Sequence, residues 1–180
     1  MKTIPKAKKV KKVLKKHNDK RIDNYFWLRD DSRKNKEVLN YLRSERNYHD
    51  EWLKTKSNIS NKYLKKLNGY IPAKDESLKV ERNGFFYFSE TLKKNDYRKY
   101  YRSRGKNLKK ELILDINKLA KNKKFYQVSS VSPSKNNHLL AFAEDTNGRR
   151  EYTIKVKHIK TERNLKDKIS GTDGQFIWSE

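Results

Sequence analysis

The residues that could perform nucleophilic chemistry in this chain are its serines and its four histidines, His17, His49, His138 and His158. A serine hydrolase of the α/β type projects its nucleophile from a strained elbow of the form G-x-S-x-G. None of the six glycines frames a serine in that way. Without such a serine, no histidine has a nucleophile to activate as a general base. We therefore predict that the histidines are structural or exposed and that the chain holds no catalytic residue.

No metal or cofactor site is predicted either. Glu45 and His49 are four residues apart and would share one helical face, but a single pair falls far short of a metal site. The sequence contains no P-loop, G-x-G-x-x-G, H-E-x-x-H or EF-hand pattern. It also contains no cysteine, which excludes disulfides, thiolate zinc sites and cysteine nucleophiles. The expected set of cofactor and metal ligands is therefore empty.

One segment, residues 97–104 (YRKYYRSR), interleaves aromatic and basic side chains. This pattern is typical of a surface that stacks nucleic-acid bases while its cations neutralise the backbone. It is equally typical of a β-strand whose aromatic side chains point inward and whose basic side chains are solvated. The strand is favoured, because no RNA-binding fingerprint or groove-reading helix occurs elsewhere.

The whole chain is strongly basic. Its 46 basic and 22 acidic residues give a formal net charge of +24, and such a field favours non-specific, salt-sensitive binding to polyanions. Lysines (34) far outnumber arginines (12), and 17 asparagines accompany them. Nucleic-acid readers depend on the planar fork of arginine. The composition therefore favours drift toward AT-rich codons over a selected nucleic-acid surface.

The N-terminal residues 1–16 include a basic run, KAKKVKKVLKK, without the apolar core of a signal peptide. We predict a solvated, disordered tail for these residues. No apolar stretch approaches the roughly 20 residues that span a membrane. Together with the absence of cysteine, these features predict a cytoplasmic protein with no membrane partner.

The elements that would position a site fall into two regions of different periodicity. Residues 31–67 have a helical pattern, and Asp30, Asp31 or Ser32 can cap a first helix. Its stripe would consist of Val38, Leu42, Glu45, Tyr48 and Trp52. A second helix would begin at Ser57, end at Gly69, and carry Ile59, Tyr63, Leu64 and Leu67. Both helices are amphipathic, so each requires an apolar surface to pack against.

After Pro72 the pattern changes to short strands. Strands are predicted at residues 84–88, 97–102, 111–116, 125–131, 138–144 and 152–159, with 176–178 opening one more. Residues 132–137 form a turn cluster, and Asn147-Gly148 predicts a tight turn. This spacing is typical of β-propeller blades of roughly 40–50 residues. A small β-sandwich is the alternative, which is less favoured because residues 176–179 repeat the motif that precedes His138.

Several blocks, in the correct order, resemble the prolyl oligopeptidase family of serine peptidases, and within it the oligopeptidase B branch. They are residues 23–31 (DNYFWLRDD), 38–42, 45–48, 71, 75–77, 85–88, 111–117, 131–133 and 145–153 (DTNGRREYT). Asn24 and Arg29 favour oligopeptidase B, because prolyl endopeptidases usually carry Pro and Glu there. The resemblance covers residues 17–180.

The resemblance implies a seven-bladed β-propeller that filters substrates by size, paired with a C-terminal α/β-hydrolase domain that cleaves short peptides after Arg or Lys. The Ser-Asp-His triad, the oxyanion hole and the acidic specificity pocket belong to that domain, so none maps to this chain. The predicted fold is therefore an α+β fragment that lacks the hydrolase domain. Residues 1–16 would be the tail, 17–70 helices that pack on the missing domain, and 71–180 about two blades of the propeller.

Two functions from different classes follow. The first is the non-catalytic N-terminal portion of a serine oligopeptidase, with its own hydrolase domain and short basic peptides as partners. The second is a stand-alone basic interaction module that binds nucleic acid non-specifically. The first predicts that Val38, Leu42, Tyr48 and Trp52 form an exposed apolar stripe. The charge of +24 is unusual for it, because it would repel cationic substrates at low salt.

Overall fold

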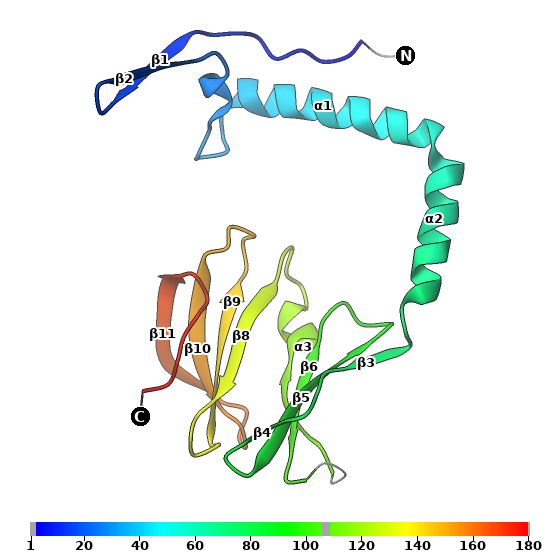
Figure 1. Ribbon diagram of the computed structural model, residues 1–180, viewed down its shortest axis with the longest axis vertical. Coiled ribbons are helices and arrows are strands. Elements are labelled where there is room, and N and C mark those ends of the chain that lie inside the picture. Colours follow the sequence, from blue (N-terminus) through cyan, green and yellow to red (C-terminus); the bar gives the residue numbers. More distant parts are fainter. Residues whose placement is uncertain (1–2, 106–108, 180) are drawn as a thin grey trace. The chain divides into compact units, whose positions relative to one another are not determined.

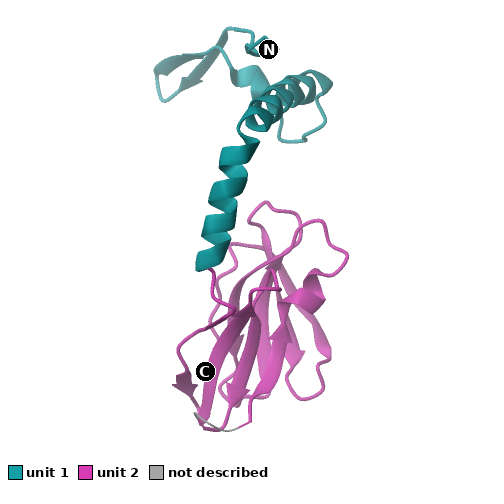
Figure 2. Cartoon of the chain, turned by 90° about the vertical axis from the view of Figure 1, so that its right-hand side faces the viewer, with its two compact units in different colours: residues 1–70 teal, residues 71–180 magenta. Residues whose placement is uncertain are grey.

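The structure is a computed structural model that describes residues 3–105 and 109–179. The chain forms two compact units, unit 1 (residues 1–70) and unit 2 (residues 71–180), shown in different colours in Figure 2. Unit 1 contains the two long helices, and unit 2 consists mainly of antiparallel strands (Figure 1). Helices followed by antiparallel sheets confirm the predicted fold class.

Unit 1 begins with a β-hairpin rather than a disordered tail. Strands β1 (Lys12–Lys16) and β2 (Asp19–Asp23) pair antiparallel. His17 and Asn18 between them have φ of 49° and 63°, the left-handed backbone of a two-residue hairpin turn. The prediction of a disordered tail over residues 1–16 is wrong for β1, because the backbone groups of this strand are paired with those of β2. The long lysine side chains, which suggested solvation, tolerate an exposed two-stranded sheet.

A 3-10 turn, η1 (Phe26–Leu28), precedes helix α1 (Lys36–Thr55) and helix α2 (Ser57–Tyr70). The cap of α1 is Asn35, whose Oδ1 accepts the backbone N–H groups of Glu37 and Val38 at 2.9 and 3.3 Å. The predicted cap Asp30 instead accepts the Asn35 N–H at 2.7 Å, so it supports the true cap from outside the helix. Helix α2 begins at the predicted Ser57 but continues through Gly69. No helix in the described ranges is both long and apolar enough to cross a lipid bilayer.

The first sheet of unit 2 has five strands, in the order β3–β5–β6–β7 with β4 also paired to β5. They are β3 (Lys74–Glu76), β4 (Val80–Arg82), β5 (Phe85–Leu92), β6 (Lys99–Ser103) and β7 (Glu111–Asp115). Strands β3 and β4 pair with opposite halves of β5, so together they act as one interrupted strand. Asn83 and Gly84, with φ of 50° and 78°, make the two-residue turn between β4 and β5.

The second sheet has four strands in the order β11–β10–β9–β8. They are β8 (Gln127–Pro133), β9 (Leu139–Asp145), β10 (Tyr152–His158) and β11 (Asn164–Thr172). The short helix α3 (Ile116–Ala120), capped by Asp115, precedes β8. Each sheet is thus an antiparallel meander of the size of one propeller blade. Residues 176–178 do not form the predicted strand; they lie along β8, where Trp178 Nε1 donates to Ser132 O at 3.2 Å.

One apolar core joins the two sheets. Its buried members are Ile113, Leu114, Ile116, Tyr126, Leu140, Phe142 and Ile159. Strand β9 is buried along almost its whole length, from Leu140 to Asp145. A strand with both faces covered needs no alternation of apolar and polar residues, which explains its continuous LLAFA sequence. The core therefore rests on contacts between the two sheets.

Unit 2 has two distinct ends (Figure 1). The β3 end contains Ile71, the β5–β6 turn and the β9–β10 loop, because β3 pairs with the last residues of β5. The Asn137 end contains the β4–β5 turn, the β8–β9 loop and the β10–β11 turn. There Asn137 Nδ2 donates to Asn83 O at 2.8 Å, and Tyr87 Oη donates to Asn137 Oδ1 at 2.7 Å. These bonds fix the Asn137 loop against the first sheet.

Candidate functional site

The histidines of unit 1 do not form a catalytic pair. His17 occupies the β1–β2 turn. His49 is exposed on α1, with Nδ1 3.5 Å from Asp50 Oδ1. Its predicted companion Glu45 instead accepts a hydrogen bond from Tyr41 Oη. Glu45 and His49 therefore lie on the same helix as predicted, but each side chain contacts a different residue.

The histidines of unit 2, His138 and His158, both line a pocket at the Asn137 end. Over residues 3–105 and 109–179, no group of three or more His, Asp or Glu side chains could hold a metal ion. That this chain holds no catalytic, cofactor-binding or metal-ligating residue stays a prediction.

The basic and aromatic segment of residues 97–104 contains strand β6 and offers little free aromatic surface. The Tyr100 ring packs against the core. The Tyr101 ring stacks on Phe88 with 5.6 Å between centroids, and the Lys110 ammonium lies 4.4 Å from the Tyr101 centroid. Arg102 is buried rather than solvated, and its Nε donates to Glu111 Oε2 at 2.8 Å. The fold itself uses these rings, as the strand interpretation predicted.

The aromatic block of residues 25–28 organises unit 1. The Trp27 ring packs edge-on against Tyr41, with 5.8 Å between centroids. Its Nε1 donates to Lys8 O at 2.8 Å, while the Lys8 ammonium lies 5.3 Å from the ring centroid and pairs with Glu37. The basic run is thus attached to the aromatic block through backbone, cation–π and ionic contacts. Sequence patterns indicated the block but gave no signal for its contact with Lys8.

Apolar side chains remain exposed along both helices of unit 1. Leu42 and Trp52 of α1 are 52% and 51% exposed, whereas Val38 is 4% exposed and Tyr48 is half-buried. The predicted stripe is therefore wrong at Val38, which faces the interior of unit 1. The four apolar side chains predicted for the second helix are each more than half exposed on α2: Ile59, Tyr63, Leu64 and Leu67. We call these four, with Leu42 and Trp52, the apolar helix residues; a set of this kind marks an interaction surface.

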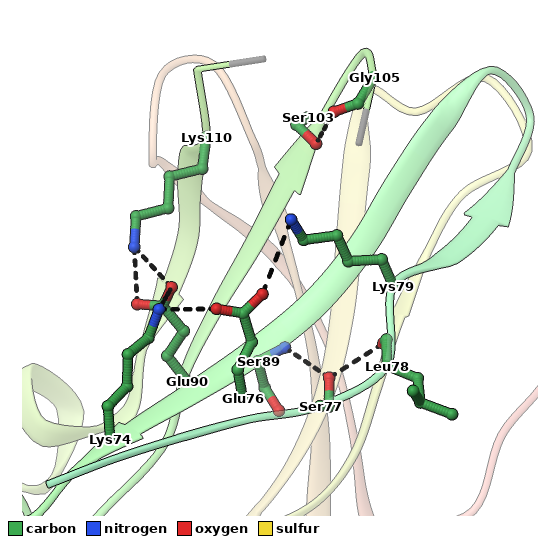
Figure 3. A network of polar contacts seen from close by, with 10 residues as sticks. All are labelled: Lys74, Glu76, Ser77, Leu78, Lys79, Ser89, Glu90, Ser103, Gly105 and Lys110. Carbon is green, nitrogen blue, oxygen red and sulfur yellow. Dashed lines mark hydrogen bonds and ion pairs between the residues drawn. The ribbon is translucent and has the colours of Figure 1, made fainter. Parts of the chain in front are cut away.

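A buried carboxylate ties the first sheet of unit 2 together (Figure 3). Glu90 on β5 is 7% exposed and accepts from Lys110 Nζ at 2.6 and 2.7 Å. Lys74 Nζ on β3 lies 2.9 Å from Glu90 Oε1 and donates to Glu76 Oε2 at 2.6 Å. Burial opposes ionisation of Glu90, but the bonds from Lys110 and Lys74 outweigh it and hold the pKa of its carboxyl below the ordinary value. The network is structural, because every charge in it has a partner.

Beside this network, Ser77 bridges the interruption between β3 and β4. Its Oγ accepts the Ser89 N–H at 2.9 Å, and its own N–H donates to Ser89 O at 2.9 Å (Figure 3). The next side chain, Leu78, is 89% exposed. It lines an apolar pocket of about 410 Å³ together with Val80, Phe88 and Pro133. This pocket could not be predicted from sequence patterns, because it forms only where the two sheets meet.

The β9–β10 loop at the β3 end is built around Asp145, which is 1% exposed. Its Oδ1 accepts the N–H groups of Asn147 and Gly148 at 2.8 and 2.9 Å, and Oδ2 accepts that of Arg150 at 2.9 Å. Burial of the carboxyl opposes ionisation, but the backbone donors outweigh it and lower the pKa of Asp145. The loop is longer than the predicted Asn147-Gly148 hairpin turn, because the hydrogen bonds to Asp145 rather than the dipeptide determine its conformation.

Comparison with known proteins identifies the family. Residues 5–180 match the family described as prolyl oligopeptidase, N-terminal beta-propeller domain. Dipeptidyl aminopeptidase BI of Pseudoxanthomonas mexicana is 32% identical over 97% of this chain and 26% of its own length. Protease 2 of Moraxella lacunata is 28% identical over 92% of this chain and 25% of its own. The chain thus spans about a quarter of the length of these curated relatives.

Solved structures agree with this result. Oligopeptidase B from Leishmania major matches with a TM-score of 0.86 and 27% identity, over 98% of this chain and 27% of that one. Oligopeptidase B from Trypanosoma brucei, in a closed form with covalently bound antipain, matches with a TM-score of 0.84 and 27% identity, over 97% and 27%. The resemblance to oligopeptidase B inferred from sequence blocks is confirmed. The chain belongs to the prolyl oligopeptidase family and corresponds to its N-terminal β-propeller domain.

Proposed function

We propose that this chain is the N-terminal, non-catalytic portion of a serine oligopeptidase that resembles oligopeptidase B. The observation that carries the proposal is the match of residues 5–180 to the propeller family, together with fold similarity to two oligopeptidase B structures. No serine of the sequence sits in a G-x-S-x-G elbow. The nucleophile of the parent enzyme would therefore lie in a hydrolase domain that follows these residues. A cytoplasmic location is part of the proposal, which the cysteine-free sequence suits.

In this proposal unit 2 contributes the first blades of the propeller that filters substrates by size. Its two antiparallel sheets already pack face to face through a common core, as neighbouring blades must. Further blades would complete the ring and cover the outer faces of these sheets. Access to the active site would then be limited to short peptides.

Unit 1 would bind the hydrolase domain through the apolar helix residues. The six apolar helix residues of α1 and α2 have large side chains that are each at least half exposed. Burying a leucine side chain contributes about 1.5–3 kcal/mol, so a partner that covered these residues would be held firmly. The hydrolase domain of the same polypeptide is the proposed occupant, because the relatives continue for about three further quarters of their length.

The proposed reaction is cleavage of short peptides after Arg or Lys. The relatives suggest two alternatives that an assay can separate, since one is called a dipeptidyl aminopeptidase and another a protease. A dipeptidyl aminopeptidase needs a free substrate amino terminus, whereas an endo-acting oligopeptidase accepts a blocked one.

The experiment is to purify the native polypeptide that carries this sequence and to supply fluorogenic substrates with Arg, Lys or Pro at the cleavage position. Each substrate is offered with a blocked and with a free amino terminus. Rapid cleavage of blocked Arg and Lys substrates supports the proposal. Cleavage of only those substrates that have a free amino terminus, or cleavage after Pro alone, would reassign the specificity. No cleavage of any substrate by an intact polypeptide would overturn the proposal.

A further inference from the structure

The Asn137 end of unit 2 contains a pocket of about 750 Å³ that both sheets line. The first sheet and the residues just beyond β6 supply Arg102, Glu111 and Arg104. The second sheet and its loops supply His158, His138 and Lys160. The position is opposite to the β3 end, where the chain enters unit 2. The pocket takes no part in the contacts proposed above, so the inference stands apart from the proposed function.

The cations of this pocket are not all neutralised by the fold. Arg102 is committed, because Nε donates to Glu111 Oε2 at 2.8 Å and a terminal nitrogen donates to Asn137 O at 2.5 Å. Glu111 is the only carboxylate among the lining residues that the structure describes. Arg104 and Lys160 are exposed, and within the described part of the chain neither makes an ion pair. Two positive charges thus remain, beside two imidazoles that can donate hydrogen bonds.

The Arg104 side chain is held in place although its charge is free. Its guanidinium carbon lies 5.2 Å from the centroid of Phe85, and that of Arg102 lies 4.5 Å from the same centroid. Stacking on an aromatic ring positions a guanidinium and leaves its N–H groups directed outward. The two guanidiniums therefore lie over the Phe85 ring within the pocket. This ring is then not free to stack on a nucleobase.

These features select a particular class of ligand. Guanidinium forks match phosphate oxygens in a bidentate manner, and a lysine ammonium adds a point charge. A carboxylate carries one negative charge and would neutralise only one of these two cations, whereas a chain of phosphates carries several charges. We propose that this pocket is a binding site for a short phosphate chain, such as the triphosphate group, with Arg104 and Lys160 as its principal cationic contacts.

The test is calorimetric titration of the chain with inorganic tripolyphosphate at fixed ionic strength. The test variant is Arg104→Ala/Lys160→Ala. The matched control is Lys94→Ala/Arg149→Ala, which removes the same charge from exposed positions at the β3 end. We expect saturable one-to-one binding, weakened about tenfold or more in the test variant, because hydrogen bonds to charged groups are strong. The control should change the affinity by less than about twofold. Thermal melts establish that both variants are folded.

A second titration with ATP and with AMP distinguishes the phosphate chain from a nucleoside. The proposal predicts that ATP binds about as tightly as tripolyphosphate and that AMP binds far more weakly. Equal weakening in the two double variants would show that only the overall charge of +24 attracts the anion, and would overturn the proposal. AMP binding as tightly as ATP, or no saturable binding to the unaltered chain, would overturn it as well.

Discussion

At the scale of single residues, buried charges decide where the stability of this fold is most sensitive to substitution and to pH. Asp145 is 1% exposed and binds three backbone N–H groups of its loop. Lys157 on β10 is 9% exposed, and no ion pair is formed by it within the described ranges. The first charge is compensated by hydrogen bonds of the fold, whereas burial of the second outweighs its attraction to Glu162. Opposite consequences for stability follow.

Asp145→Asn should lower the free energy of unfolding by about 1–3 kcal/mol at pH 7, because one charged acceptor of backbone N–H groups is lost. Since the folded pKa of Asp145 is below its unfolded value of about 3.9, its stabilising effect is present above that pH and is lost as pH falls through the folded pKa. Urea denaturation at pH 7 and at pH 3 measures both effects. Asp167→Asn, on the exposed strand β11, is the control. Equal acid sensitivity of Asp145→Asn and the unaltered chain would contradict the account.

Lys157→Met should raise the free energy of unfolding at pH 7 by about 0.5–1.5 kcal/mol, because it replaces a poorly solvated ammonium by an apolar side chain. Burial lowers the pKa of Lys157 in the folded state. The unfolded chain therefore binds this proton more strongly, and the stability of the unaltered chain should rise as pH approaches the ordinary lysine value of about 10.4. Denaturation between pH 7 and pH 10 tests this.

Lys155→Met is the companion variant, because Lys155 Nζ lies 2.5 Å from Glu144 Oε1 on the neighbouring strand. This change leaves a buried carboxylate without its cation and should destabilise the chain. The account is wrong at this point if both methionine variants shift stability in the same direction.

At the scale of elements, close approach of the backbone fixes the segment that follows β11. A Cβ added at Gly174 would lie 2.3 Å from Ser129 Oγ and 2.8 Å from the Tyr152 ring, and φ at Gly174 is +87°. Ser129 Oγ also donates to Gly174 O at 2.9 Å. Residues 173–178 are thereby held against β8.

Gly174→Ala should cost about 2–3 kcal/mol of unfolding free energy, from overpacking and from the left-handed backbone. The matched control is Gly69→Ala, because Gly69 lies in α2 with nothing within 4 Å of the added Cβ. That change should be neutral or stabilising by up to about 1 kcal/mol, since alanine favours helix over glycine. Chemical denaturation of the two single variants compares them. Similar effects of both changes would contradict the packing described for Gly174.

Sequence periodicity could predict the elements that bury an apolar face. The helices of unit 1 and the strands around Phe88, Leu114 and Phe142 were found in this way. Strand β11 was not predicted because its sequence NLKDKISGT is mostly charged or polar, and an edge strand needs few apolar contacts. Hairpin β1–β2 was not predicted because its many lysines indicated a solvated, disordered segment, although His17-Asn18 is a turn-forming pair.

Polar contacts between distant residues could not be predicted from the sequence. Glu90 and Lys110 are twenty residues apart, and Tyr87 and Asn137 are fifty apart. The register of β5 against its neighbours determines which of the many lysines pairs with the buried carboxylate of Glu90. For the same reason the sequence could not distinguish Val38, which is buried, from Leu42 on the same stripe. Periodicity gives a face of a helix, but not what covers each part of it.

At the scale of the whole molecule, two surface features of this chain bear on the proposed hydrolase domain. The apolar helix residues and the strong positive charge are both unusual for an isolated soluble unit. A hydrolase domain that covered the helices would explain the first feature. If that domain were acidic, it would also offset the second and restore attraction for cationic peptides.

Leu64→Gln/Leu67→Gln tests the proposed surface in the native polypeptide. Both leucines are more than half exposed here, so the isolated chain should keep its melting temperature. In the native polypeptide the variant should lose about 3 kcal/mol or more of packing and cleave peptides more slowly. The control Lys65→Gln/Lys66→Gln changes exposed polar positions on the same helix. If both variants retain full activity and stability, the helices do not bind the hydrolase domain.

Membership in a larger serine oligopeptidase can be tested by weighing the native polypeptide that carries this sequence and by treating it with a fluorophosphonate that labels active serines. The account predicts a polypeptide roughly four times the mass of these 180 residues, since the chain spans about a quarter of its relatives. It also predicts one labelled serine outside residues 1–180, and loss of Arg- and Lys-directed cleavage on labelling. A native polypeptide of 21.7 kDa that takes up no label would contradict it.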